Sequence, residues 1–204
     1  GWVDVLAKMR DLEASYLLPG HTKAVIGKEL VKETLSNYHD AIAYVLEETL
    51  KGINQGKTMD QLACEVKLPE QWAELPYLQE FYGTVEWSVR SIYTGYMGWF
   101  DGNPTKLGTM EPSQKAIKML ALMGGAENVL QEVDRALAME DDQWAAELCD
   151  ILLDAGEAVE EARKRKAEAL MYLGRMMTSA NGRHYYIACA KELRGKESTI
   201  TIKL

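Results

Sequence analysis

A long apolar stripe in the first quarter of the chain most strongly constrains its fold. Apolar and β-branched residues recur there at alternating steps of four and three residues: Val31, Leu35, Tyr38, Ile42, Val45 and Thr49. This spacing is typical of a seam along one face of an α-helix. Leu46, Leu50 and Ile53 widen the seam, and an Asn-Gln-Gly sequence at 54–56 ends it. The pattern predicts a helix of about seven turns. Its partner is either a helix of the same chain or the same helix in a second subunit.

The rest of the chain also predicts helices separated by short breaks. Thr58 and Gln61 have the spacing of a capping box, and we expect a short helix that ends before Pro69. Apolar and aromatic residues from Tyr77 to Tyr96 recur at steps of three and four, which predicts one wide helical face. The last third predicts a series of antiparallel helices: one opened by Pro112, others at 128–139, 143–153 and 160–177, and a final one led into by Asn181-Gly182.

The predicted helices of the last third resemble the hairpins of tetratricopeptide repeats. Internal matching recovers little more than an Ala-Leu pair at 136–137 against another at 169–170. We therefore expect repeat-like architecture without a true repeat. The fold class predicted for the whole chain is mostly α, a helical bundle with antiparallel, tetratricopeptide-like hairpins.

Charge and cysteine content exclude several classes of function. The formal net charge is −8, which argues against a nucleic-acid partner. The basic cluster at 163–166 follows Glu157, Glu160 and Glu161, so we interpret it as a solvated helix face paired within the same helix. Cys64, Cys149 and Cys189 are too widely spaced for a zinc knuckle or a disulfide framework, and we expect them to be small buried hydrophobes. No apolar stretch is long enough for a transmembrane segment.

No motif in the sequence marks an independent catalytic centre. There is no Gly-x-Ser-x-Gly, Walker or dinucleotide-binding motif. Paired acids such as Glu47 and Glu48 are adjacent, and adjacent residues on a helix do not face each other. We assign no catalytic residue in this chain.

The sequence Gly-Trp-Phe-Asp-Gly-Asn-Pro at 98–104 predicts a sharp turn built around two aromatic residues. We expect Trp99 and Phe100 to pin this turn to a neighbouring element. Such a turn can simply end a helix, or it can line a site. The residues alone leave both readings open.

The turn and its neighbours resemble the helical dimerisation domain of alkyl sulfatases that have a metallo-β-lactamase fold. The string at 98–104 is the most specific part of the resemblance, together with Tyr-Gly-Thr-Val at 82–85 and Val-Arg-Ser-Ile-Tyr at 89–93. Further similar segments lie at 37–44, 49–50, 53–56, 124–126, 144–148 and 190–194. The resemblance therefore covers most of the chain.

This resemblance implies three parts. Residues 1–27 would be the C-terminal end of a metallo-β-lactamase-like hydrolase domain, a short α/β remnant. Residues 28–195 would be the all-helical dimerisation domain, and 196–204 a linker or the first strand of a following domain. The start of the chain agrees, since an apolar helical stripe from Trp2 to Leu12 precedes 17–21, which reads as a short buried strand ending in a turn. We infer a C-terminal portion of a longer enzyme.

The resemblance also implies site residues. On its residues alone, His21 after Pro-Gly is read as a turn residue, whereas the resemblance makes it a metal ligand. The family's hydrolase domain binds two zinc ions through a His-x-His-x-Asp-His cluster, which this chain lacks, and through later acidic residues and a histidine. Tyr82 is carried over as a substrate-binding residue. Arg90 is the second substrate-binding candidate, and it can pair either with an anion or with a carboxylate such as Glu86. Relatives often have Ser-His-Asn where this chain has Glu-Trp-Ser at 86–88, which removes a histidine able to donate a proton.

Two functions follow from these observations. In the first, the chain pairs subunits as a homodimer and shapes the pocket of a zinc-dependent hydrolase. Its partners are the upstream hydrolase domain and an alkyl or aryl sulfate ester, and we expect the segment alone to lack turnover. In the second, it is a non-catalytic α-helical module that binds a protein partner. The residues leave the cellular location open.

Overall fold

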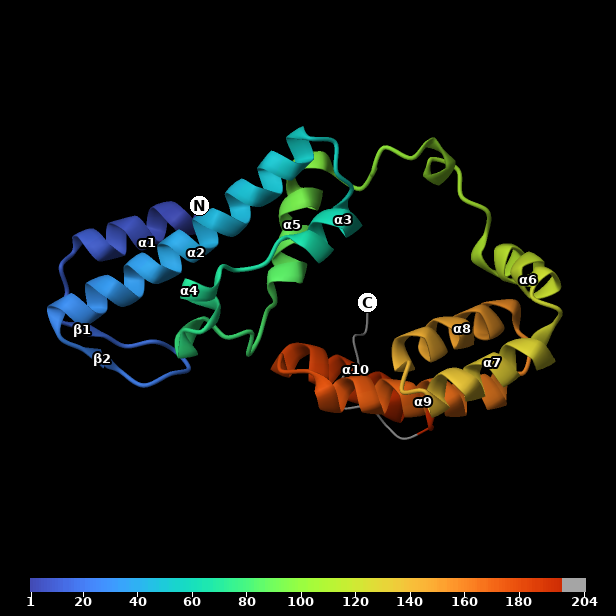
Figure 1. The fold of residues 1–204 in the computed structure, drawn as a ribbon. Helices are drawn as coiled ribbons and strands as arrows, with labels where there is room; N and C mark the ends of the chain where they lie inside the picture. Colours follow the sequence, from blue (N-terminus) through green and yellow to red (C-terminus); the bar gives the residue numbers. More distant parts are fainter. Residues whose placement is uncertain (196–204) are drawn as a thin grey trace. The chain divides into compact units, whose positions relative to one another are not determined.

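The computed structural model describes residues 1–195, and within them the chain is mostly helical. It forms ten α-helices, two short 3-10 helices and one two-stranded sheet (Figure 1). The chain divides into two compact units, Gly1–Asn103 and Pro104–Leu204. The mostly α fold class is thereby confirmed, whereas the division into three parts at 27 and 195 stays a prediction. Residues 196–204, predicted as a linker or strand, lie outside the described residues.

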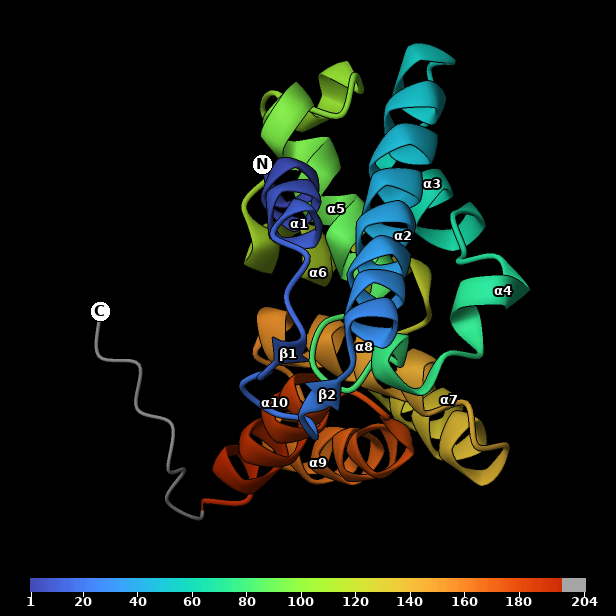
Figure 2. The same ribbon diagram turned by 90° about the vertical axis from the view of Figure 1, so that its left-hand side faces the viewer.

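The first unit is organised around its longest helix. Its elements are α1 (Trp2–Asp11), β1 (Tyr16–Leu17), β2 (Val25–Ile26), α2 (Lys28–Asn54), α3 (Met59–Glu65), α4 (Glu70–Ala73), the 3-10 helix η1 (Pro76–Leu78) and α5 (Val85–Met97). Both α1 and α5 pack against α2, and α3 packs against α5 (Figure 2). The predicted long helix and the Thr58–Gln61 capping box are confirmed.

The seam of α2 is covered by elements of the same unit. Val31, Leu35, Val45 and Thr49 are all less than 8% exposed. Val45 joins a core cluster whose other members are Leu62, Ala63, Val66, Val89 and Tyr93. Of the two partners that the sequence left open, the same chain therefore covers these seam positions.

The start of the chain differs from the predicted buried strand. β1 pairs with β2 as an antiparallel ladder of two residues each, with Tyr16 opposite Ile26 and Leu17 opposite Val25. Leu18 is 79% exposed, so the prediction of a buried strand over 17–21 is wrong. This short ladder packs beside α2.

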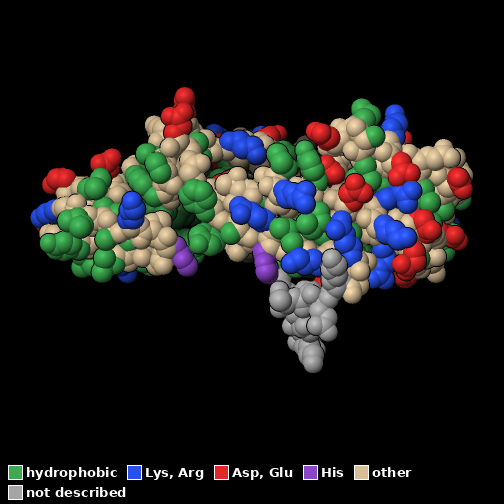
Figure 3. Space-filling model, turned by 90° about the horizontal axis from the view of Figure 1, so that it is seen from below, with side chains coloured by type: hydrophobic (Ala, Val, Ile, Leu, Met, Phe, Trp, Pro, Cys, Tyr) green, Lys and Arg blue, Asp and Glu red, His purple; other side chains and the backbone are tan. Residues whose placement is uncertain are grey.

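Large apolar side chains are exposed on α1, the hairpin and the start of α2. We call this set the N-terminal apolar face: Trp2, Val5, Leu12, Tyr16, Leu18, Ile26 and Leu30. Figure 3 shows hydrophobic side chains gathered over the hairpin end of the first unit, at the left of that view. The predicted stripe on the first helix exists, but no residue of α1 is buried.

The segment before α5 also departs from the prediction of one helical face from Tyr77 to Tyr96. The 3-10 helix η1 ends at Leu78 and α5 begins only at Val85. Asn37 donates a hydrogen bond to the Tyr77 hydroxyl (2.8 Å), and the Tyr38 hydroxyl donates to the Tyr77 carbonyl (2.5 Å). Tyr77 is thus fixed to α2 and lies outside α5. The cause is local, because Thr84 caps α5 by accepting a hydrogen bond from the backbone N–H of Trp87.

The second unit consists of consecutive helices that pack against their neighbours. They are the 3-10 helix η2 (Pro104–Lys106), α6 (Pro112–Leu122), α7 (Ala126–Ala138), α8 (Asp142–Ala155), α9 (Val159–Met176) and α10 (Ala180–Leu193). α8 packs against α6, α7 and α9, and α9 packs against α10. Ala145, Leu148 and Leu152 of α8 are fully buried. Pro112 opens α6 as predicted, whereas Asn181-Gly182 lies inside α10 because Ser179 caps that helix.

The basic cluster of α9 is paired with other helices. Arg165 binds Asp134 of α7 at 2.6 Å, Lys166 binds Asp150 of α8, and the Nε of Arg163 donates to the carbonyl of Leu193. Pairing with Glu157, Glu160 and Glu161 of the same helix was predicted, and the structure corrects this assignment. The residues lie on the side of α9 that packs against its neighbours, so carboxylates of those helices are within reach.

The cysteines divide into two classes, and only one agrees with the prediction. Cys149 is fully buried in the second core, whereas Cys64 and Cys189 are exposed. Burial raises the pKa of the Cys149 thiol to about 11. The expectation of three buried cysteines is therefore wrong at two positions.

The first testable prediction concerns these thiols. Cys64 and Cys189 should react with a disulfide reagent at pH 8 in the native protein, and Cys149 should react only after unfolding, because it is both inaccessible and protonated. Spectrophotometric titration of released thiolate checks this. Cys149→Ala should leave the number of thiols that react in the native protein unchanged. A smaller number would contradict the assignment of Cys149 as the unreactive thiol.

The second prediction concerns the close approach of α2 and α3. A Cβ added at Gly52 would lie 2.1 Å from Cδ2 of Leu62, a side chain that is 1% exposed. Gly52→Ala should therefore lower the free energy of unfolding by about 1–3 kcal/mol, since a packed core resists overpacking. Gly95→Ala is the matched control, because Gly95 lies inside α5 with open space around it. Gly95→Ala should raise the free energy of unfolding by about 0.5–1 kcal/mol. Urea unfolding of both variants measures the difference, and a stabilising Gly52→Ala would contradict the packing.

Candidate functional site

Two of the three site residues predicted from the sequence lie in contact. The ring centroids of His21 and Tyr82 are 5.1 Å apart, with the ring planes inclined by 37°. His21 is exposed, and Tyr82 is 49% exposed. A contact of this kind holds two rings side by side. The pair is the candidate site of the first unit.

The loop between β1 and β2 positions His21. The loop leaves β1 through Pro19-Gly20 and returns at Val25. The Gly27 N–H donates to the carbonyl of Ser15 at 2.9 Å, and Lys28 binds Glu13 at 2.6 Å. These contacts close the base of the hairpin onto the start of α2, so the position of His21 is tied to the main helix.

Hydrogen bonds at both ends fix the segment that carries Tyr82. At its start, the side-chain amide of Gln79 donates to the carbonyls of Ala73 and Leu75. At its end, the Val85 N–H donates to Oε1 of Glu80 at 2.6 Å, and Thr84 caps α5. Tyr82 is therefore held on a short loop between two fixed points.

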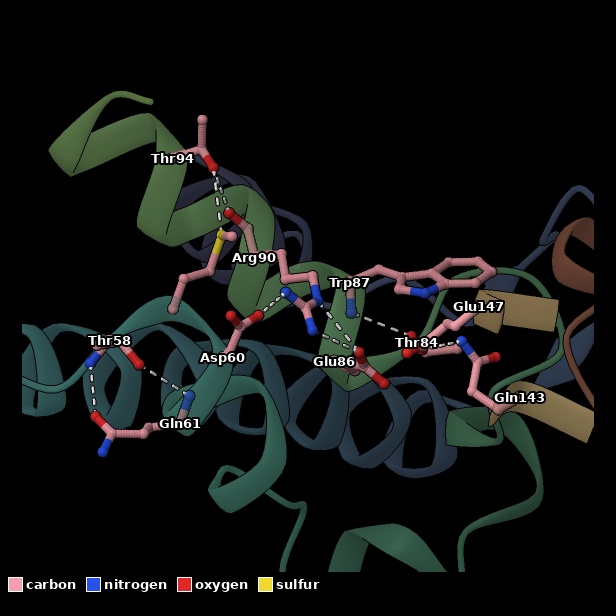
Figure 4. A network of polar contacts seen from close by, with 11 residues as sticks. Thr58, Asp60, Gln61, Thr84, Glu86, Trp87, Arg90, Thr94, Gln143 and Glu147 are labelled. Atoms are coloured by element: carbon pink, nitrogen blue, oxygen red, sulfur yellow. Dashed lines mark hydrogen bonds and ion pairs between the residues drawn. The ribbon is translucent and has the colours of Figure 1, made fainter. Parts of the chain in front are cut away.

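Arg90 lies on α5 between two carboxylates. Its Nη1 is 2.6 Å from Oδ1 of Asp60, and its Nε donates to Oε1 of Glu86 at 3.1 Å (Figure 4). The hydrogen bond to Asp60 is the main cause that raises the pKa of Arg90. The pairing with Glu86 was one alternative in the sequence, whereas Asp60 was missed, because no spacing rule relates residues on separate helices. Binding of a substrate by Arg90 stays a prediction.

The described residues do not assemble a metal site of their own. Across residues 1–195, no group of three or more His, Cys, Asp or Glu side chains is placed to hold a metal ion. A zinc site needs three or four such ligands around one position. His21 can supply one imidazole, so the donor set present here does not fit a complete zinc centre.

Comparison with known proteins identifies the family. Residues 58–196 match the family model described as alkyl sulfatase dimerisation. The chain belongs to the alkyl sulfatase dimerisation family. This match includes Tyr82 and Arg90, whereas His21 precedes it. Among the described helices, none is long and apolar enough to cross a membrane.

Relatives from this family are similar along nearly all of the chain. A linear primary-alkylsulfatase from a Pseudomonas strain is 42% identical over 96% of this chain and 37% of its own length. An (R)-specific secondary-alkylsulfatase from Pseudomonas sp. is 31% identical over 95% of this chain and 29% of its own. The solved structure of the stereoselective inverting sec-alkylsulfatase Pisa1 from Pseudomonas sp. superposes with a TM-score of 0.89 at 32% identity, covering 98% of this chain and 32% of that one. The chain thus spans about a third of the length of these relatives.

The ring contact between His21 and Tyr82 leads to the third prediction. In the Tyr82→Leu variant, the ring protons of His21 should shift toward the values of a free imidazole, because the adjacent aromatic ring is lost. Proton NMR of the three histidines checks this. His184 belongs to the second unit and serves as an internal control whose signals should stay in place. Unchanged His21 signals would contradict the contact.

Proposed function

We propose that this chain is the dimer-forming part of an alkyl sulfate ester hydrolase and that His21 and Tyr82 form an edge of its substrate pocket. The observation that carries the proposal is their ring contact, because it joins the hairpin at the start of the chain to the Tyr-Gly-Thr segment inside the family match. The relatives described above are alkylsulfatases, which supports this substrate class.

The chemistry of the exposed aromatic residues suits such an ester. An alkyl sulfate has an anionic head and an apolar chain. The Tyr82 hydroxyl can donate a hydrogen bond to a sulfate oxygen while its ring packs against the first carbons of the chain. Phe81, which is 51% exposed beside it, adds apolar surface. These residues bind and orient, and we assign no catalytic residue within this chain.

For the metal we propose zinc, with His21 as one of its ligands. Zinc bound in a hydrolase supplies an activated water molecule at neutral pH. Since the described residues do not complete the ligand set, we derive no reaction step from the metal. The remaining ligands would come from the hydrolase domain, which we propose to pack on the N-terminal apolar face. Support comes from the side chains of that face, of which Trp2 and Leu18 are each more than three quarters exposed.

We also propose that the chain forms a homodimer. The description of the matched family supports this state. An apolar surface that lies within the family match and remains exposed in one copy of the chain is where such a contact would form.

The fourth prediction tests the role of Tyr82 at the pocket edge, in the full-length protein. Tyr82→Phe keeps the ring but removes the hydroxyl, so kcat/KM for release of sulfate from a linear alkyl sulfate should fall about tenfold or more, the effect of one hydrogen bond to a charged group. Tyr185→Phe is the control, since Tyr185 is similarly exposed on α10 of the second unit. Sulfate release measured by ion chromatography gives both values. Equal activity of Tyr82→Phe and wild type would rule out this role.

Arg90 can be tested in the same assay. If it serves only the ion pairs with Asp60 and Glu86, Arg90→Gln should cost at most about 1 kcal/mol of stability and leave KM unchanged, because both partners are largely exposed. A rise in KM without loss of stability would assign it to the substrate. The 204-residue chain alone should release no sulfate.

A further inference from the structure

The turn that follows α5 has a backbone path that its glycines permit and that hydrogen bonds fix. Gly98 ends the helix with φ +76°, and its N–H donates to the carbonyl of Thr94 at 2.8 Å. Gly102 has φ +88°, a left-handed value that other residues rarely adopt. The residues on either side of Gly102 are joined by a hydrogen bond, in which the Asn103 N–H donates to Oδ1 of Asp101 at 3.1 Å. This turn therefore has a defined shape that sets the direction of Trp99.

The defined turn leaves its aromatic residue in solvent. Trp99 is 74% exposed, although the sequence predicted that it would pin the turn to a neighbour, and that prediction is wrong for the described chain. Phe100 packs against the indole in an edge-on arrangement, with ring centroids 5.9 Å apart. Tyr96 and Met97, at the end of α5, are 63% and 49% exposed. We call Tyr96, Met97 and Trp99 the α5-end patch.

The patch has the composition of the centre of a protein interface. Residues 91–100 contain no charged side chain, in a protein where 26% of residues are charged. Interface centres are depleted of charge and enriched in Trp, Tyr and Met, and Trp is the residue most typical of binding hot spots. A tryptophan presented outward on a fixed turn also loses little conformational entropy on binding.

We propose that a second copy of this chain covers the α5-end patch. This inference rests on the proposed homodimer and names its contact surface. The whole patch lies inside residues 58–196, the range that matches the dimerisation family, whereas the N-terminal apolar face lies entirely before that range. The seam of α2 is not available for this role, because its buried positions are already covered within the first unit.

The exposed area sets how much of the contact the patch provides. At exposed fractions of 63%, 49% and 74%, its three side chains offer roughly 400 Å² in each copy. In a two-fold dimer, the same patch is covered in both copies, which gives about 800 Å² in total. A specific interface is larger than about 1,000 Å², so the patch forms the apolar centre of the contact and residues around it form the rim.

The fifth prediction tests this surface on the 204-residue chain by light scattering over a dilution series. The wild type should dimerise, and Met97→Ser combined with Trp99→Ser should raise the dissociation constant at least thirtyfold, as expected for loss of a hot spot. Trp99→Phe keeps an aromatic ring and should retain most of the affinity. Circular dichroism of each variant should match the wild type, because the replaced side chains are largely exposed.

Trp2→Ser is the matched control, since Trp2 is 78% exposed on the N-terminal apolar face. It should leave the dissociation constant unchanged. A wild-type dimer that is unaffected by the Met97 and Trp99 changes, or that is weakened equally by Trp2→Ser, would overturn the proposed surface while leaving the homodimer in place. A wild type that stays monomeric at every concentration would overturn the homodimer itself.

Discussion

Burial of the α2 seam within the first unit is the constraint on which the other features depend. A helix of 27 residues with a continuous apolar face is stable in water only when that face is covered. α1 and α5 pack against it, and Gly52 lets Leu62 of α3 approach its last turns. Because these positions are occupied by the same chain, any contact with another polypeptide has to use a different surface. The exposed apolar side chains of the unit are therefore the residues that indicate where another polypeptide binds.

Local signals in the sequence were sufficient to predict the helices but not the ion pairs that join one helix to another. The bounds of α2, the capping box at Thr58 and the proline that opens α6 each depend on residues within one or two turns of the chain. Arg90 shows the limit. Its partner Glu86 lies one helical turn away, whereas Asp60 reaches it from α3. The cations of α9 were misassigned for the same reason, because packing between helices decides which carboxylate is within reach.

The contact at the candidate site could not be predicted from the sequence either. Resemblance to a family suggested His21 and Tyr82 separately, but nothing in their spacing predicted a contact between them. That contact arises because the hairpin closes onto the start of α2 and the segment at 79–84 is not helical. The aromatic periodicity from Tyr77 onward favoured a continuous helix, and one local feature and one contact with a distant helix opposed it. Thr84 caps a new helix, and Tyr77 is bound by Asn37 and Tyr38 of α2.

α5 connects the candidate site to the proposed dimer contact. Its first residue follows the Thr84 cap that ends the Tyr82 segment, and its last residue precedes the turn that presents Trp99. A helix of 13 residues spans about 20 Å, and its rotation is fixed because Val89 and Tyr93 are buried in the core. Covering the last turn of this helix would restrict fraying at that end. The loop that holds Tyr82 lies at the opposite end, where its own contacts fix it: the Thr84 cap and the hydrogen bond from the Val85 N–H to Glu80.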